Sequence, residues 1–511
     1  MKQSYSKNYL KIYLWQGISM VLNFLSMFIV IPYLTSDPTV YGIYSVCISF
    51  AIFLSYADLG FIGAGQKYAS EYFAQGNQQQ EIKVIGFTHF ILLVFLIIFS
   101  LLFFWFSKNP EILVKGIDNR KHHEVASSLL LIMSLFTPTT LLQRLLQMIY
   151  SIRMEDYIIQ RINIIGSAIK IFSVLWFFKS EKYDIVGYFL FTQIVNLVVS
   201  IFSLILTKKR YSYNFKLLLT SIHFNKEIFD ITKSLAFTSL LITICWILYY
   251  ELDSVAIGKM LGAKSVAIYT IGLTILSFFR SILGIVFSPF NIRFNHYIGI
   301  NDEESLKNVY LQVVTIFAPI VTIPLITIFI FSKYIVLTWV GKEYLESISV
   351  IQFLILCNLF AFITYPTNFM LIAKEKQKML YVINFIIPII FWSGIFLSVT
   401  YLGVKSFAIF KLIAFLFSAI FSIHIMIKYL KINNIDIFYH IFKSLAIPFI
   451  FIFIILFLSE NYLPTYQSKT NLFLVGIFIT SIISISLVTQ FILDKNWRTY
   501  IINISTQLKN K

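Results

Sequence analysis

The chain has 511 residues, of which 58% are hydrophobic and only 13% are charged, and its mean hydropathy is +0.80. A soluble protein typically has about a quarter charged residues, so this composition excludes an ordinary soluble chain. The formal net charge of +17 could indicate a nucleic-acid partner. The Lys and Arg residues gather instead in polar loops beside long apolar runs, which is typical of a membrane protein with no nucleic-acid partner.

The apolar runs predict an all-α, polytopic membrane protein with about fourteen transmembrane helices. A spanning helix needs about 20 mostly apolar residues. These runs are too continuously apolar for barrel strands, which alternate. In chain order, the predicted spans are 11–34, 41–64, 82–106, 124–150, 157–179, 184–207, 229–251, 265–290, 307–331, 346–371, 378–401, 404–428, 440–459 and 470–493.

Loop charges predict the orientation of these spans. If the N-terminus is cytoplasmic, the loops and span ends on the cytoplasmic side carry about twice as many Lys and Arg residues as those on the opposite side. An even number of spans then places the C-terminus in the cytoplasm as well. We expect a multi-pass protein of the bacterial inner membrane.

Two pairs of similar segments predict an internal repeat. Leu34–Tyr44 (LTSDPTVYGIY) aligns with Leu261–Tyr269 (LGAKSVAIY), and Ile162–Ile165 (INII) aligns with Ile383–Ile386 (INFI). Repeats of this kind in membrane proteins are typical of transporters. The pattern predicts two six-helix lobes related by a pseudo-two-fold repeat: an N-lobe (1–207), a basic cytoplasmic linker (208–228), a C-lobe (229–430), and a final helix pair with a tail (431–511).

Short motifs in both halves resemble the polysaccharide biosynthesis (oligosaccharide flippase) family. Tyr41-Gly42-Ile43-Tyr44 is similar to the family's E-Y-G-L-Y, and Asp58-Leu59-Gly60 to its D-L-G. The resemblance covers residues 8–430, and its other motifs are Leu252-Asp253, Leu261-Gly262, Ile268-Tyr269, Pro289 and Val340-Gly341-Lys342-Glu343-Tyr344. Two positions depart from the family pattern: Lys67 replaces an arginine, and Ser254 stands where a basic residue often follows the aspartate.

This resemblance implies a member of the superfamily of multidrug, oligosaccharidyl-lipid and polysaccharide exporters. It implies two lobes around a central cavity that work by alternating access. The implied substrate is an undecaprenyl-diphosphate-linked oligosaccharide destined for O-antigen (lipopolysaccharide) or capsule. Membrane lipids, a polysaccharide polymerase and its chain-length regulator are the other implied partners.

Cations inside the spans are the candidate contacts of a diphosphate headgroup. A charged residue at the centre of a span costs roughly 2.5–3.5 kcal/mol on insertion scales, so each needs a partner, a wet cavity or a function. Arg144, Lys170, Arg280 and Lys411 lie deep in predicted spans. Arginine suits phosphate because its planar fork binds two oxygens at once. Lys67 is a further candidate, with anchoring at the cytoplasmic surface as its alternative role.

The other deep cations also have structural alternatives. Arg144 could pair with a neighbouring glutamine or a lipid phosphate, and Lys170 and Lys411 could snorkel toward the membrane surface. Gln16 and Asn23 in the first span are candidate sugar contacts, whereas helix–helix hydrogen bonding is their commoner role.

Asp58 is the clearest acid inside a span, and we assign it, with Asp253, to gating or ion coupling. The repeat places Asp58 and Arg280 at nearly equal depth on opposite lobes. A salt bridge between them that closes a gate is therefore one alternative to a substrate contact by Arg280. Capping of the local turn at Gly60 is the alternative for Asp58.

No phosphate-binding glycine loop, metal-ligand spacing or nucleophile–base set stands in the sequence, so we expect no enzyme, cofactor or metal. The predicted function is a flippase for lipid-linked oligosaccharide. The alternatives, in order, are a lipid II flippase, a cation-coupled multidrug exporter and a membrane polysaccharide polymerase. Drug exporters of this superfamily commonly rely on a carboxylate in the first helix, yet residues 11–34 contain none.

Overall fold

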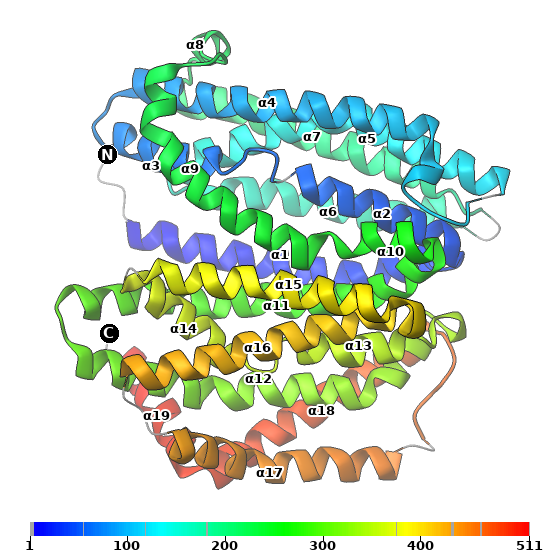
Figure 1. The fold of residues 1–511 in the computed structure, drawn as a ribbon, viewed down its shortest axis with the longest axis vertical. Helices are drawn as coiled ribbons and strands as arrows, with labels where there is room; N and C mark the ends of the chain where they lie inside the picture. The colour runs from blue at the N-terminus through cyan, green and yellow to red at the C-terminus, as the bar shows by residue number, and fades with distance from the viewer. Residues whose placement is uncertain are drawn as a thin grey trace. The chain divides into compact units, whose positions relative to one another are not determined.

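The computed structural model describes residues 5–54, 56–117, 119–179, 182–374, 376–430, 434–459 and 462–509. These residues form helices joined by short turns, with no strand among them, which confirms the all-α prediction (Figure 1). The extreme ends of the chain, for which a cytoplasmic location is predicted, lie outside the described residues. Contacts divide the chain into two compact units, unit 1 (Met1–Ala267) and unit 2 (Ile268–Lys511).

Unit 1 is built from ten α-helices and two short helical turns among its described residues. Helices α4, α5 and α7 pack side by side, and α3 covers one end of α4 (Figure 1). The elements are α1 (Tyr5–Leu34), α2 (Pro38–Leu54), α3 (Phe61–Ala74), α4 (Gln78–Lys108), η1 (Pro110–Ile112), α5 (Arg120–Ile152), α6 (Asp156–Phe177), α7 (Ile185–Tyr211), α8 (Phe215–Thr220), α9 (Lys226–Trp246), η2 (Ile247–Glu251) and α10 (Asp253–Leu261).

Unit 2 begins at Ile268, in the first turns of α11. Its long helix α12 packs against α13, α14, α17 and α18, while α15 pairs with α16. The elements are α11 (Ala263–Gly299), α12 (Glu303–Trp339), η3 (Lys342–Tyr344), α13 (Ser347–Leu356), α14 (Ala361–Ala373), α15 (Gln377–Leu402), α16 (Lys405–Leu430), α17 (Asn434–Ser459), α18 (Lys469–Leu493) and α19 (Lys495–Lys509).

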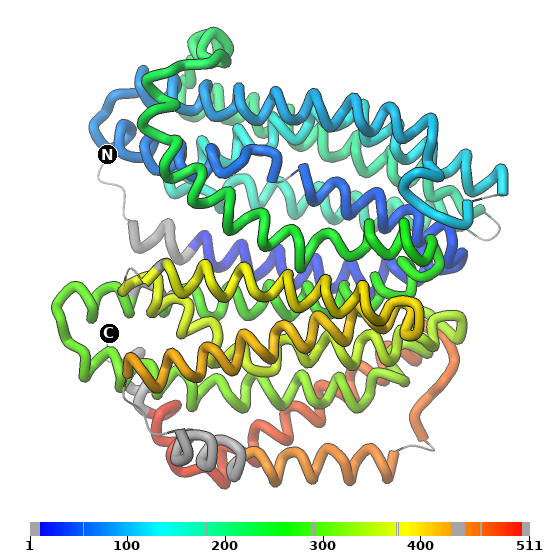
Figure 2. Tube along the Cα trace, in the orientation of Figure 1, coloured from blue at the N-terminus to red at the C-terminus, as the bar shows by residue number. Residues whose placement is uncertain are grey.

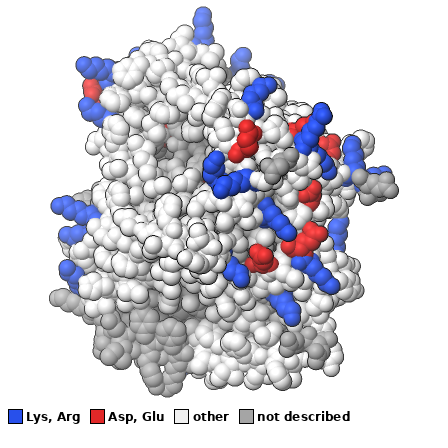
Figure 3. All heavy atoms as spheres, turned by 45° about the vertical axis from the view of Figure 1, so that its right-hand side comes forward, with Lys and Arg blue, Asp and Glu red and all other residues white. Residues whose placement is uncertain are grey.

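Eleven helices of the described chain are long and apolar enough to cross a membrane, or twelve if the bent pair α13 and α14 is one span. Two shorter apolar helices, Pro38–Leu54 and Leu445–Ser459, fall at two further predicted spans. The multi-pass architecture is thus confirmed, and the count of fourteen stays a prediction. On the face drawn in Figure 3, charged side chains gather in patches and leave wide uncharged areas between them.

The lobe boundaries predicted from the repeat are not the boundaries of the contact units. Helices α9 and α10 pack with unit 1, although the repeat assigns 229–430 to the second lobe. A contact unit and a sequence repeat are different divisions of a chain, so the assignment of lobes stays a prediction.

The predicted second span, 41–64, is interrupted in the structure, and Figure 2 traces the break between α2 and α3. Leu59 and Gly60 have φ angles of 50° and 80°, which a continuous right-handed helix cannot contain. A Cβ on Gly60 would lie 2.6 Å from the Ala236 carbonyl oxygen of α9, so only glycine fits there. Asp58 accepts a hydrogen bond from the Ile62 amide at 3.0 Å and caps the start of α3.

The two similar segments of the repeat meet inside unit 1. A Cβ on Gly42 in α2 would lie 1.8 Å from the Ala263 carbonyl oxygen at the start of α11. The neighbouring Gly262 has a φ of 91° and packs against the carbonyl of Lys115. Close approach of backbones requires glycine at both positions, which gives a physical reason for the Tyr-Gly and Leu-Gly motifs.

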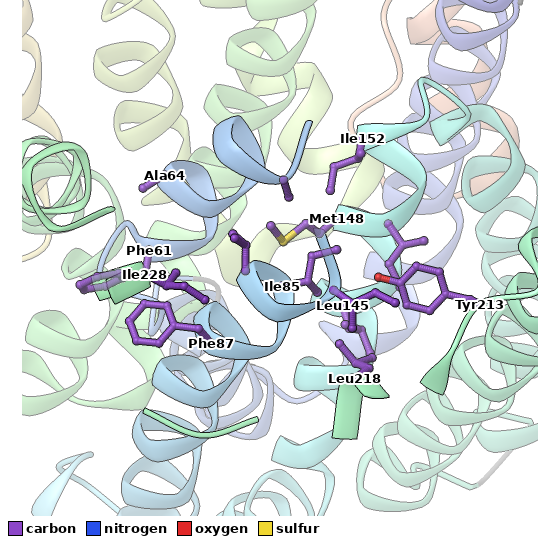
Figure 4. Close-up of a cluster of buried hydrophobic side chains, with 14 of the residues drawn as sticks. Phe61, Ala64, Ile85, Phe87, Leu145, Met148, Ile152, Tyr213, Leu218 and Ile228 are labelled. Atoms are coloured by element: carbon purple, nitrogen blue, oxygen red, sulfur yellow. The ribbon is translucent and has the colours of Figure 1, made fainter. Parts of the chain in front are cut away.

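The segment 208–228 packs onto unit 1 through a core of buried apolar side chains (Figure 4). Tyr213 and Leu218 belong to this core together with Ile85 of α4 and Ile149 of α5. Ser221 sits directly against Gly86 of α4, where a Cβ would meet it at 2.6 Å. The connection that follows α7 is therefore anchored to α4 and α5.

Candidate functional site

Unit 1 holds a partly open cavity of about 650 Å³ among helices α1, α2, α5, α6 and α7. This volume is within the range of small-molecule sites, about 300–1,000 Å³. The side chains that line it are unusually polar for the inside of apolar helices. Four glutamines and three asparagines contribute: Gln143, Gln147, Gln160, Gln193, Asn23, Asn163 and Asn196.

The cavity extends from the turn between α5 and α6 toward the middle of these helices. Its α6 wall consists of residues spaced three or four apart, which places them on one face of a 3.6-residue helix. They are Asp156, Gln160, Asn163, Ser167 and Lys170. Residues on α7 repeat the spacing, at Gln193, Asn196, Ser200 and Ser203. Each helix therefore presents a polar stripe to the cavity.

The structure brings three of the predicted site residues, Arg144, Lys170 and Asn23, together in this cavity. The Lys170 ammonium donates to the Asn196 amide oxygen at 2.9 Å. Arg144 lies 3.4 Å from the Gln147 amide oxygen, in agreement with the glutamine partner considered from sequence. Its charge also acts on the Asp58 carboxylate.

The other predicted site residues of unit 1 do not line the cavity. Gln16 lies on α1 outside the lining, and Lys67 is exposed on α3 with its ammonium 5.0 Å from the Tyr68 ring centroid. Asp253 is fully buried at the first turn of α10. Asp58 has the capping role described above, and its predicted role in gating or coupling is not tested by that contact.

Arg280 and Lys411 belong to unit 2. Arg280 on α11 is half-buried and close enough to interact electrostatically with Tyr365. Lys411 on α16 is only 1% exposed, and its ammonium lies 5.4 Å and 6.0 Å from the ring centroids of Phe391 and Tyr269. Asp58 and Arg280 fall in different units, and the ion pair predicted between them stays a prediction.

A second polar region, which we call the Arg153 cluster, lies at the turn between α5 and α6. The Arg153 guanidinium is 2.8 Å from the Glu81 carboxylate and donates to the Ile149 carbonyl at 2.9 Å. Both side chains of the ion pair are buried. Three aromatic rings, Phe73, Tyr211 and Tyr213, enclose the guanidinium with centroids 4.8–5.4 Å away.

Glu155 completes the Arg153 cluster. It accepts hydrogen bonds from the Arg210 guanidinium at 2.6 Å and 2.8 Å and another from the Tyr211 hydroxyl. Burial acts to raise the pKa of Glu155, but these donors and the charge of Arg153 hold it below its usual value. The cluster ties the α5–α6 turn to the ends of α4 and α7.

The sequence alone did not predict the Arg153 cluster or most of the cavity amides. The amides carry a recognisable signal, because polar residues recur at helical spacing inside apolar spans at 156, 160, 163, 167 and 170. The Arg153–Glu81 pair has no such signal, since 72 residues separate its members. Among the described residues, no group of three or more His, Cys, Asp or Glu side chains is placed to hold a metal ion.

The family model for polysaccharide biosynthesis proteins matches residues 6–290, more than half of the chain. The chain belongs to this polysaccharide biosynthesis family. The MatE model matches residues 238–392 of the same chain. No curated protein matches it in sequence.

Solved structures show the fold of this family member. The inward closed conformation of the lipid II flippase MurJ aligns with a TM-score of 0.70 at 13% identity, covering 97% of this chain and 99% of MurJ. An inward-facing multidrug resistance MATE transporter of the MOP superfamily aligns with a TM-score of 0.66 at 16% identity, covering 81% and 95%. A MOP superfamily transporter from Pyrococcus furiosus aligns with a TM-score of 0.58 at 15% identity, covering 84% and 97%. The chain has a MurJ- and MATE-like transporter fold.

Proposed function

We propose that this polysaccharide biosynthesis family member is a flippase that moves undecaprenyl-diphosphate-linked oligosaccharide from the cytoplasmic to the outer leaflet. The observation that carries the proposal is the polar cavity of unit 1. Intramembrane polar groups are costly and mark substrate pathways, and here they line a cavity large enough for part of a glycan. The match to the polysaccharide biosynthesis family supports a substrate from that pathway.

In this proposal, the intramembrane cations bind the diphosphate headgroup. Arg144 and Lys170 supply positive charge in the cavity of unit 1, and Arg280 supplies it in unit 2. A headgroup that leaves water needs such groups in place of its hydration, and an arginine offers paired donors. Lys67 and Lys411 add to the headgroup path, Asp58 and Asp253 to gating or coupling, and Gln16 and Asn23 to sugar contacts.

Under the proposed orientation, the cavity end at the α5–α6 turn faces the cytoplasm, where the glycan is assembled. Both termini are then cytoplasmic and the membrane is the bacterial inner membrane. O-antigen or capsule is the polymer that we propose the exported units build, with a polymerase and chain-length regulator acting after export.

A lipid II flippase is the second candidate. The alignment with MurJ over 97% of the chain favours it. Lipid II also joins sugars to undecaprenyl diphosphate, so the same cavity chemistry would serve both substrates. The two candidates differ in the glycan that accumulates when export fails.

The test is the fate of lipid-linked glycans in cells that lack the protein. We expect complete undecaprenyl-diphosphate oligosaccharides to accumulate in the cytoplasmic leaflet while surface polysaccharide disappears. Accumulation of lipid II with normal surface polysaccharide would support the second candidate instead. Unchanged lipid pools and unchanged surface polysaccharide would overturn both.

A further inference from the structure

The cavity of unit 1 is mainly a surface of uncharged hydrogen-bonding groups. Its seven carboxamides outnumber its two cations, Arg144 and Lys170. Each carboxamide offers two N–H donors and one acceptor oxygen, which suits the hydroxyl and amide groups of sugars. A diphosphate has acceptor oxygens only, and it would leave the carboxamide oxygens without donors.

The charged groups in the cavity also favour a sugar ligand. Asp156 lines the cavity near the α5–α6 turn, and its carboxylate would repel a diphosphate there. The Lys170 ammonium already donates to Asn196, and Arg144 lies beside Gln147. Each cation is therefore bonded to an amide, and the remaining carboxamides form most of the hydrogen-bonding surface of the cavity.

Several of the amides have free hydrogen-bonding capacity toward the cavity. Within the described part of the chain, the side chains of Gln160, Asn163 and Gln193 form no hydrogen bond with other protein groups. They come from two helices, and all three line the cavity. Their N–H and C=O groups are thus available to a ligand.

We infer that the unit 1 cavity binds the sugar residues of the lipid-linked substrate, and that Gln160, Asn163 and Gln193 determine its affinity for the glycan. This inference rests on the proposed function. It assigns glycan recognition to the carboxamides of the cavity and leaves recognition of the lipid diphosphate to the cations named above.

The experiment measures binding by the full-length protein in lipid nanodiscs, with two probes. One probe is undecaprenyl diphosphate, and the other is undecaprenyl-diphosphate-linked oligosaccharide extracted from cells of the source organism that lack the protein. The test variant carries Gln160→Ala, Asn163→Ala and Gln193→Ala. The control carries Gln75→Ala, Gln78→Ala and Gln79→Ala, which removes three exposed carboxamides outside the cavity.

We expect the wild type to bind the oligosaccharide-linked probe more tightly than undecaprenyl diphosphate. Loss of three hydrogen-bonding groups should weaken binding of the oligosaccharide-linked probe by about tenfold or more. Affinity for undecaprenyl diphosphate should not change, which also shows that the variant is folded. The control should match the wild type with both probes.

Three results would overturn the inference. If the cavity variant keeps wild-type affinity for the oligosaccharide-linked probe, the carboxamides do not recognise the glycan. If it loses affinity for both probes equally, the cavity does not distinguish sugar from diphosphate. If the wild type binds neither probe, the proposed function fails together with the inference.

Discussion

Two polar regions of unit 1 lie close together along the chain but are built in opposite ways. In the Arg153 cluster, cations and carboxylates meet at 2.6–2.8 Å and aromatic rings enclose the arginine. In the cavity that begins at the same α5–α6 turn, carboxamides and hydroxyls predominate, and Lys170 donates to an amide rather than a carboxylate. The charges of the cluster are thus paired within the protein, whereas the polar groups of the cavity face open volume.

From this difference we predict which polar residues serve the fold and which serve the proposed transport. Removing one member of a buried ion pair leaves an uncompensated charge, so the Arg153 cluster should matter for stability. Half-exposed amides contribute little to folding, so substitutions of the cavity residues should leave stability nearly unchanged. Because we propose that these amides contact the substrate, the same substitutions should impair transport. Arg153 and Arg144 are nine residues apart on the same stretch of chain, and their surroundings separate their roles.

The largest stability effect should come from Arg153→Ala. Its guanidinium is buried against Glu81, and removing it leaves that carboxylate without its cation. Breaking such a pair costs about 3–5 kcal/mol. Thermal unfolding of the purified protein should show a large fall in midpoint.

Arg120→Ala is the matched control, because Arg120 pairs with Glu124 at 2.9 Å on an exposed helix turn. Exposed pairs of this kind contribute little, and the midpoint should stay at the wild-type value. Equal destabilisation by the two variants would contradict a structural role specific to the Arg153 cluster.

Lys170→Met should impair transport and leave stability nearly unchanged, whereas Arg153→Ala should mainly reduce stability. We expect transport of lipid-linked oligosaccharide to fall about tenfold or more, because a charge-assisted donor is lost from the cavity. Stability should change by less than about 1 kcal/mol. The measurements are export in cells and thermal unfolding of the same variant, with Lys209→Met on the exposed end of α7 as control. Normal export by Lys170→Met would remove Lys170 from the substrate path.

Glu155→Gln should produce a smaller, pH-dependent loss of stability. Because the pKa of Glu155 is lowered in the folded protein, its charge stabilises the fold above the usual glutamate pKa and ceases to do so as the pH falls through the lowered value. The difference between wild type and variant should be about 1 kcal/mol at neutral pH and vanish in acid. The measurement is the unfolding midpoint of wild type and variant at several pH values from neutral to acid. A difference in midpoint that does not depend on pH would contradict the ion pair.

The smallest stability effect should come from Asn163→Ala. Its side chain is exposed to the cavity, so stability should change by less than about 0.5 kcal/mol. Gln66→Ala removes a hydrogen bond of 2.8 Å to Ser151 and should cost about 1 kcal/mol. If Asn163→Ala destabilised the protein more than Gln66→Ala, the cavity amides would be part of the packing.

The sequence predicted those features that depend on local composition. Apolar runs located the helices, and the cost of intramembrane charge singled out Arg144 and Lys170, which the structure places in one cavity. The break at Gly60 was missed, because it depends on the approach of Ala236 from a distant helix.

The Arg153–Glu81 pair was missed for the same reason, since only the fold brings its members together. The bend of 45° between α13 and α14 also interrupts a run that hydropathy shows as continuous. Local pattern therefore predicted the helices, and tertiary contact decided where they break and which charges pair.

The most direct test of the account is translocation by the full-length protein in sealed vesicles. Undecaprenyl-diphosphate-linked oligosaccharide would be incorporated, and its exposure measured with a glycosidase that cannot cross the membrane. We predict that wild-type protein makes the glycan on the inner leaflet accessible from outside, and that vesicles with Lys170→Met resemble protein-free vesicles. Equal accessibility of the glycan in wild-type and protein-free vesicles would contradict the flippase function. Full activity of Lys170→Met would contradict passage of the substrate through the cavity of unit 1.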